Sequence, residues 1–187
     1  MSDTTTTVEI LKRLERLESI DEIKKLKQRS AIAADPFMDM EMLINLYTED
    51  GVMEIPTFGL VLTGHNEIRA FLEVNAFTWM FHCLIPLQVE IGKDGQTATA
   101  NWYLWEAATV HNGRTGKYDP VLFAGAYEDE MQKINGEWKL THTILTVRLL
   151  CNYEEGWAEN QINVNKDWVG KAQSLMNTIE NDRGANV

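Results

Sequence analysis

The chain has 187 residues, 44% of them apolar and 24% charged, which is the length of one domain or of a domain with appendages. Its 17 basic and 28 acidic side chains give a net charge of −11, which leaves no basic face for a nucleic-acid backbone. No apolar run approaches the roughly 20 residues that cross a bilayer, and the polar start MSDTTTT lacks the apolar segment of a signal peptide. We therefore expect a cytoplasmic protein that binds neither nucleic acid nor membrane.

Helical patterns dominate the first part of the chain. From Val8 to Ala34 apolar residues recur at spacings of three and four with charges between them, which predicts an amphipathic helix, and residues 1–7 are expected to be disordered. The helix should end there because Pro36 disfavours the helical conformation at Asp35. Shorter elements follow: a helix over Met38 to Tyr47, a turn over Thr48 to Gly51, strands over Val52 to Ile55 and Leu60 to Leu62, and a helix over His65 to Leu72.

Strand patterns dominate the rest of the chain up to residue 150. The segments 79–91, 96–111, 118–134 and 137–150 are long, rich in β-branched and aromatic residues, and separated by turn residues such as Asn135-Gly136. Helices first and a sheet afterwards predict an α+β fold, in which the helices pack on one face of a curved, mostly antiparallel sheet. We expect a pocket between the two layers.

One domain over residues 8–150 is therefore expected, followed by a tail over residues 151–187. The tail carries Tyr153, Trp157 and Trp168 among polar residues, so we expect it to dock on the pocket or on a neighbouring subunit. The early apolar positions Ile10, Leu14 and Leu17 also favour contact with a second copy of the chain, as a dimer or a trimer.

His82 and Asp35 are the first candidates for chemistry. Of the four histidines, only His82 lies in an apolar run, and Asp35 is an acid in apolar surroundings at the end of the long helix. A histidine in an apolar pocket acts as a base if a partner fixes its tautomer, and an aspartate at one ring nitrogen does so. The alternative is a helix-terminating Asp and a hydrogen-bonded core His without catalytic roles.

Glu106 and Arg148 are charged residues inside two apolar strands. If they face inwards, they need partners or a polar ligand, because an unpaired buried charge is costly. The alternatives are that they pair with each other across the sheet or point to solvent. Strand alternation places Trp102 and Glu106 on one face and Tyr103 on the other.

No short motif for phosphate, dinucleotide or zinc binding is present, and Cys83 and Cys151 have no close partner spacing. We therefore expect no metal, no cofactor and reduced thiols. Met and aromatic residues more often form plain core, but with two acids and a histidine among them they are consistent with a cavity for a flat, hydrophobic small-molecule substrate.

The chain resembles the SnoaL-like branch of the nuclear transport factor two-like superfamily, with its cystatin-like cone. The resemblance covers roughly residues 8–155 and rests on Asp35 after the first helix, His82 in its Met-Phe-His context, and the runs Ile20 to Lys27, Asn101 to Leu104, Gly125 to Tyr127, Gly136 to Trp138 and Val147-Arg148. Within the branch, the nearest likeness is to bile-acid 7-alpha-dehydratases; hexachlorocyclohexane dehydrochlorinases and scytalone dehydratases are more distant.

The resemblance implies catalytic roles for four residues. The family's Asp–His pair falls on Asp35 and His82, its further acid on Glu106 and its arginine on Arg148. It implies a cofactor-independent lyase, a dehydratase in which His82 removes a carbon-bound proton from a steroid-like or alicyclic alcohol. Asp35 would stabilise the imidazolium, Glu106 would assist departure of water and Arg148 would anchor an oxygen.

Two tyrosines of the bile-acid enzymes are absent here: Ser30 stands at the position of one, and the other would fall at or near Ile55. We expect the ligand to contact Ile55 and Trp102, and a hydroxyl donor to come from Tyr47, Tyr103 or Tyr127. Two other functions stay open: an isomerase or cyclase in the same pocket, or a noncatalytic binding and assembly module such as the small subunit of a ring-hydroxylating oxygenase.

Overall fold

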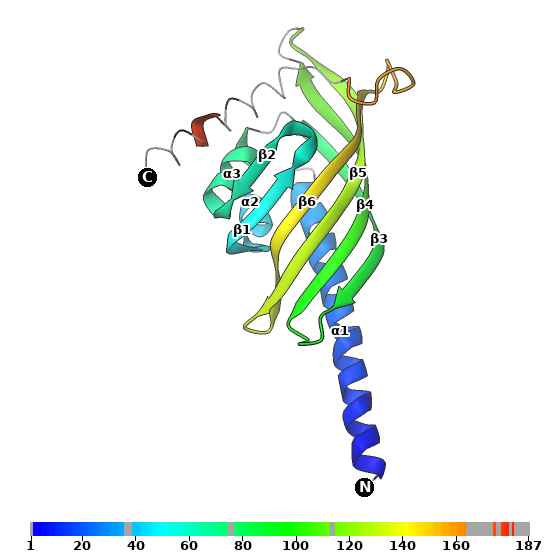
Figure 1. Ribbon diagram of the computed structural model, residues 1–187. Coiled ribbons are helices and arrows are strands. Elements are labelled where there is room, and N and C mark those ends of the chain that lie inside the picture. Colours follow the sequence, from blue (N-terminus) through cyan, green and yellow to red (C-terminus); the bar gives the residue numbers. More distant parts are fainter. Residues whose placement is uncertain are drawn as a thin grey trace.

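The computed structural model describes residues 2–35, 39–74, 77–112, 115–163, 174, 177–179 and 181. The described residues of the first half of the chain form three helices and a short hairpin (Figure 1). The helices are α1 (Ser2–Ala34), α2 (Met40–Asn45) and α3 (Gly64–Glu73); the hairpin joins β1 (Tyr47–Ile55) to β2 (Leu60–Thr63) through a 3-10 turn, η1 (Pro56–Phe58). The N-cap of α2 is Asp39, whose carboxylate accepts a hydrogen bond from the backbone N–H of Met42.

The four long strands follow closely the ranges expected from the sequence. They are β3 (Phe77–Ile91), β4 (Thr97–Asn112), β5 (Lys117–Ile134) and β6 (Glu137–Asn152). The six strands form one sheet in the order β2-β1-β6-β5-β4-β3, in which only the β1–β6 pair is parallel. Figure 1 shows the helices gathered on one face of this sheet, which confirms the α+β fold and its mostly antiparallel sheet.

α1 differs from the sequence expectation at its start. It begins at Ser2, so residues 2–7 are helical where disorder was expected, because adding residues to an existing helix costs far less than starting one. Its N-terminal part projects beyond the sheet (Figure 1), and Ile10, Leu14 and Leu17 on that part are exposed. Their contact with a second copy of the chain stays a prediction.

The turn expected over Thr48 to Gly51 is wrong, because these residues lie within β1. Tyr47 pairs with Leu140 of β6 and Val52 with His142, so four residues of β1 lie opposite a single residue of β6. The polar segment is thus taken up as an irregularity within the strand. Pairing with β6 outweighs its local preference for a turn.

The core lies between the helices and the inner face of the sheet. Ile23 and Leu26 of α1 are fully buried, together with Trp102 and Leu104, which alternate on β4. The same alternation turns the inward side chains of β5 and β6 towards α1. The residues that line the cavity described below come from the inner face of the sheet, β3 included, and from the facing helices and hairpin.

The described part of the tail packs along β6. The N–H of Leu150 donates to the carbonyl of Gln161 (2.8 Å), and the N–H of Asn163 donates to the carbonyl of Leu150 (3.0 Å). Further along, Ile179 is buried in the main core. Tyr153 and Trp157 are exposed, while Trp168 lies outside the described residues. No helix in the described residues has the length and apolar character needed to cross a membrane.

A close approach between β5 and β6 yields a stability prediction. A Cβ atom at Gly125 would lie 2.5 Å from the carbonyl oxygen of Thr146, so one strand has to shift to accept it. We expect Gly125→Ala to lower the free energy of unfolding by about 1–3 kcal/mol in urea titrations. Ala126→Ser is the matched control on the outer face and should change it little. Equal stability of the two variants would contradict this approach of the strands.

Candidate active site

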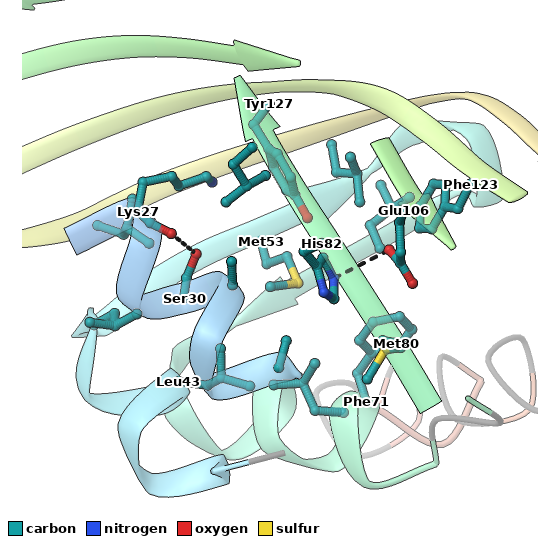
Figure 2. A pocket seen from close by; sticks show the side chains of 18 of the residues that line it. Lys27, Ser30, Leu43, Met53, Phe71, Met80, His82, Glu106, Phe123 and Tyr127 are labelled. Carbon is teal, nitrogen blue, oxygen red and sulfur yellow. Dashed lines mark hydrogen bonds and ion pairs between the residues drawn. The ribbon is translucent and has the colours of Figure 1, made fainter. Parts of the chain in front are cut away.

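A cavity of about 140 Å³ lies between the inner face of the sheet and the helices (Figure 2). Its wall is mostly apolar and includes Leu43, Met53, Phe71, Met80, Phe123 and Leu145. Few polar side chains reach it, chiefly His82 and Glu106 on one side and Lys27, Ser30, Tyr47 and Tyr127 on the other. An apolar hollow with a few convergent polar groups is typical of a small-molecule site.

His82 is held by Asp35. One carboxylate oxygen of Asp35 lies 2.6 Å from Nδ1 of the His82 ring, and the backbone N–H of His82 donates to both carboxylate oxygens at 3.2 Å. The carboxylate arrives from the residue after α1, and the imidazole from β3. Because a carboxylate accepts hydrogen bonds, Nδ1 carries the proton and Nε2 is left as the basic nitrogen.

Glu106 faces the other nitrogen of the same ring. Its Oε2 lies 3.2 Å from Nε2 of His82, a contact drawn in Figure 2. The two residues pair directly across β3 and β4, so the register of these strands sets the contact. His82 thus lies between two carboxyl groups, Asp35 at Nδ1 and Glu106 at Nε2.

The environment of Glu106 keeps its carboxyl group protonated. The side chain is 2% exposed, and its Oε1 has no hydrogen-bond partner in the described residues. Burial raises the pKa of Glu106 to about 8, and the negative charge of Asp35 adds to the rise. At neutral pH Glu106 is therefore mostly a neutral acid, able to donate its proton to Nε2 of His82 or to a ligand.

A second polar cluster lies on the opposite side of the cavity. The Nζ of Lys27 lies 2.9 and 3.2 Å from the two carboxylate oxygens of Asp129, and both side chains are almost fully buried. Thr143 donates to Asp129 at 2.9 Å, and the hydroxyl of Tyr47 is hydrogen-bonded to Thr143. The same Nζ lies 3.6 Å from the centre of the Tyr127 ring. Burial lowers the pKa of Lys27, and the charge of Asp129 opposes that change.

The three candidate tyrosines have different positions. Tyr47 and Tyr127 line the cavity, but Tyr103 is 44% exposed on the outer face of the sheet, so its expected place in the pocket is wrong. Alternation along β4 already placed Tyr103 on the other face of the sheet from Glu106. Ile55 lines the cavity as expected, whereas Trp102 is buried in the core and is not part of the wall.

Arg148 does not point into the cavity, which corrects the expectation that it would act beside Glu106. Leu145 and Val147 of β6 point inwards, so Arg148 is exposed on the outer face. There its guanidinium lies 5.9 Å from the ring centre of Tyr103. A cross-sheet pair between Arg148 and Glu106 is excluded as well, because the two side chains lie on opposite faces.

Sequence reasoning missed Lys27 and Asp129, although both carried a signal. Lys27 follows Ile23 by one helical turn and so lies on the apolar face of α1. Asp129 lies between Tyr127 and Met131 at the two-residue spacing of the inward face of β5. Within the described residues, no group of histidine, cysteine and acidic side chains is arranged to hold a metal ion.

Comparisons with known proteins agree with this architecture. No curated protein matches the chain. Among solved structures, a hexachlorocyclohexane dehydrochlorinase is 16% identical with a TM-score of 0.65, covering 75% of this chain and 92% of its own. A scytalone dehydratase candidate from Novosphingobium aromaticivorans is 18% identical with a TM-score of 0.65, covering 81% and 97%.

An aromatic ring hydroxylase candidate from the same organism is 25% identical with a TM-score of 0.62, covering 74% of this chain and 96% of its own. The sequence identities to the dehydrochlorinase and the dehydratase candidate are low, so these two likenesses describe the fold alone. The more specific resemblance to bile-acid 7-alpha-dehydratases stays a prediction. The family comparison is decisive: the SnoaL-like domain matches residues 15–144, so the chain belongs to the SnoaL-like family of the nuclear transport factor two-like superfamily.

Proposed function

We propose that this chain is a cofactor-independent lyase, a dehydratase that removes water from an alicyclic or steroid-like alcohol. The observation that carries the proposal is an imidazole between two carboxyl groups at the wall of an apolar cavity. The cavity volume of about 140 Å³ favours the alicyclic class, because an apolar cavity of about 150 Å³ in another protein binds benzene.

The proton transfers follow from the contacts of His82. A ligand hydroxyl that accepts the Glu106 proton in a hydrogen bond draws that proton away from Nε2, which frees the nitrogen. Nε2 then takes a proton from the ligand carbon adjacent to the one that carries the hydroxyl. The electrons of this C–H bond form the double bond as the C–O bond breaks. The departing hydroxide takes the Glu106 proton and leaves as water, while Asp35 stabilises the imidazolium.

The same contact restores the starting state. After the elimination His82 is an imidazolium and Glu106 a carboxylate, 3.2 Å apart. One proton transfer from Nε2 to Glu106 returns both residues to their neutral forms, with no other group needed. An acid and a base in direct contact thus suit a reaction that consumes one proton and releases another.

The fold comparison also supports an elimination. Two solved structures of this fold carry the names of elimination enzymes, the dehydrochlorinase and the dehydratase candidate. A proton-shifting isomerase is the second candidate, because the same residue pair can take a proton from one carbon and return it to another.

A product assay separates the two. We would incubate the protein with ring alcohols that carry a ketone on the carbon next to the acidic C–H, and separately with β,γ-unsaturated ring ketones, and measure product masses. Loss of one water from the alcohols supports the lyase, whereas an unchanged mass with a shifted double bond in the unsaturated ketones supports the isomerase. Absence of conversion across the panel would argue against both.

The dyad is tested by His82→Ala and Asp35→Asn. We expect both proteins to stay folded, with turnover reduced about 100- to 10,000-fold, since one loses the base and the other its orientation. His142→Ala is the matched control, because His142 forms a similar pair with Glu54 (2.8 Å), and neither residue is part of the cavity wall. Turnover that survives in both dyad variants would refute the mechanism.

The protonation of Glu106 is tested by Glu106→Gln. Because the pKa of Glu106 is about 8 in the folded state and 4.5 as its ordinary value, the folded protein holds one more proton than the unfolded chain between these pH values. The free energy of unfolding of the native protein should therefore fall with rising pH relative to the variant, by up to about 1.4 kcal/mol per pH unit.

Urea titrations from pH 5 to pH 9 measure this difference. Turnover of the native protein should also decline above about pH 8, as Glu106 loses its proton. Glu130→Gln, at an exposed position of β5, serves as the control and should leave the pH dependence unchanged. Identical pH profiles for the native protein and Glu106→Gln would show that Glu106 is ionised at neutral pH.

A further inference from the structure

The hydroxyl of Tyr127 is the free donor on the far wall of the cavity. Figure 2 shows it pointing into the cavity towards His82 and Glu106, and the described residues provide it with no hydrogen-bond partner. Tyr47, the other tyrosine of the wall, is already hydrogen-bonded to Thr143. Burial raises the pKa of Tyr127 well above its usual value, so the hydroxyl keeps its proton and remains a donor.

The ring of Tyr127 is fixed from behind by Lys27. The Nζ of Lys27 has three protons, and three groups surround it: the two carboxylate oxygens of Asp129 at 2.9 and 3.2 Å, and the Tyr127 ring at 3.6 Å. The ammonium is thus engaged by Asp129 on one side, and it holds the Tyr127 ring by a cation–π contact.

The charges around the cavity restrict what it can bind. Lys27 is neutralised by Asp129, His82 contacts Asp35 and Glu106, and Arg148 is on the outer face. A carboxylate or phosphate in the cavity would thus meet no unpaired cation among the described wall residues and would lie near the negative charge of Asp35. An uncharged oxygen, in contrast, needs only one donor.

We propose that the cavity takes uncharged single-ring ketones or alcohols whose oxygen accepts a hydrogen bond from Tyr127, and that the Lys27–Asp129 pair positions Tyr127 for this contact. The proposal rests on the proposed function in that it assigns the same cavity as the reaction site. Tyr127 is the residue that touches the ligand, and Lys27 and Asp129 are positioning residues.

Binding and infrared spectroscopy of a matched pair of probes test it without turnover. The probes are 4-methylcyclohexanone, labelled with ¹³C at its carbonyl, and 4-methylcyclohexanecarboxylate. We expect the ketone to bind at least about tenfold more tightly, because the cavity cannot pair the carboxylate. The carbonyl stretch of the bound ketone should lie below its value in hexane, as hydrogen bonding requires. Tighter binding of the carboxylate, or an unshifted stretch, overturns the ligand class.

Variants assign the donor and its support. In Tyr127→Phe the stretch should return towards the hexane value while binding weakens, and an unchanged stretch would refute the role of Tyr127. The double variant Lys27→Met/Asp129→Leu avoids leaving an unpaired buried charge. It should bind the ketone with a smaller and broader shift.

Lys133→Met is the matched control, because it removes a cation that lies 5.7 Å from the Trp138 ring outside the cavity. It should keep the native spectrum. A native spectrum in the double variant would refute the positioning role.

His82→Ala separates this proposal from the proposed function. It should lose turnover yet keep the ketone stretch of the native protein, because Tyr127 is untouched. If His82→Ala keeps turnover while Tyr127→Phe loses the shift, the elimination mechanism fails and the ligand contact stands. The reverse result leaves the mechanism intact and refutes the contact.

Discussion

The tie between Asp35 and His82 is the constraint on which the rest of the site depends. It joins the end of α1 to the middle of β3, through one ring contact and two backbone hydrogen bonds to a single carboxylate. Because the backbone N–H of His82 takes part, the carboxylate holds the strand as well as the ring. The ring therefore has one orientation and one tautomer, and its Nε2 meets Glu106 across the β3–β4 register.

The cone contains two buried polar clusters with different roles. Asp35, His82 and Glu106 form a chain of contacts that exchanges protons in the proposed reaction, and burial of Glu106 raises the pKa of this acid. Lys27 and Asp129 form an ion pair in which Asp129 accepts hydrogen bonds from Lys27 and Thr143. Such a buried pair is weak support for stability, because removing two charges from water costs about as much as their attraction returns. Its contact with the Tyr127 ring gives the pair a positioning role in the proposed ligand contact.

Periodicity predicted most of this arrangement from the sequence. The long strands, the end of α1 before Pro36, and the common face of Trp102 and Glu106 all follow from local patterns. The expectation for Arg148 came from the family resemblance, and Tyr103 was one of three expected hydroxyl donors, but strand alternation puts both on the outer face.

Other features could not be read from local patterns. The irregular segment in β1 depends on β6, which lies far away in the sequence. The contacts of His82 likewise require the register between β3 and β4, which no local pattern gives. The pairing of Lys27 with Asp129 joins residues 102 positions apart, so the sequence can place each on an inner face without showing that they meet.

The adjacency of His82 and Glu106 has a stereochemical consequence for the proposed elimination. The nitrogen that receives the proton and the oxygen that supplies one belong to neighbouring strands on a single wall. A rigid ring lying against that wall presents only one of its faces to both groups. Hydrogen and hydroxyl are thus removed from the same side of the ring, so the favoured diastereomer of the alcohol carries them in a cis relation.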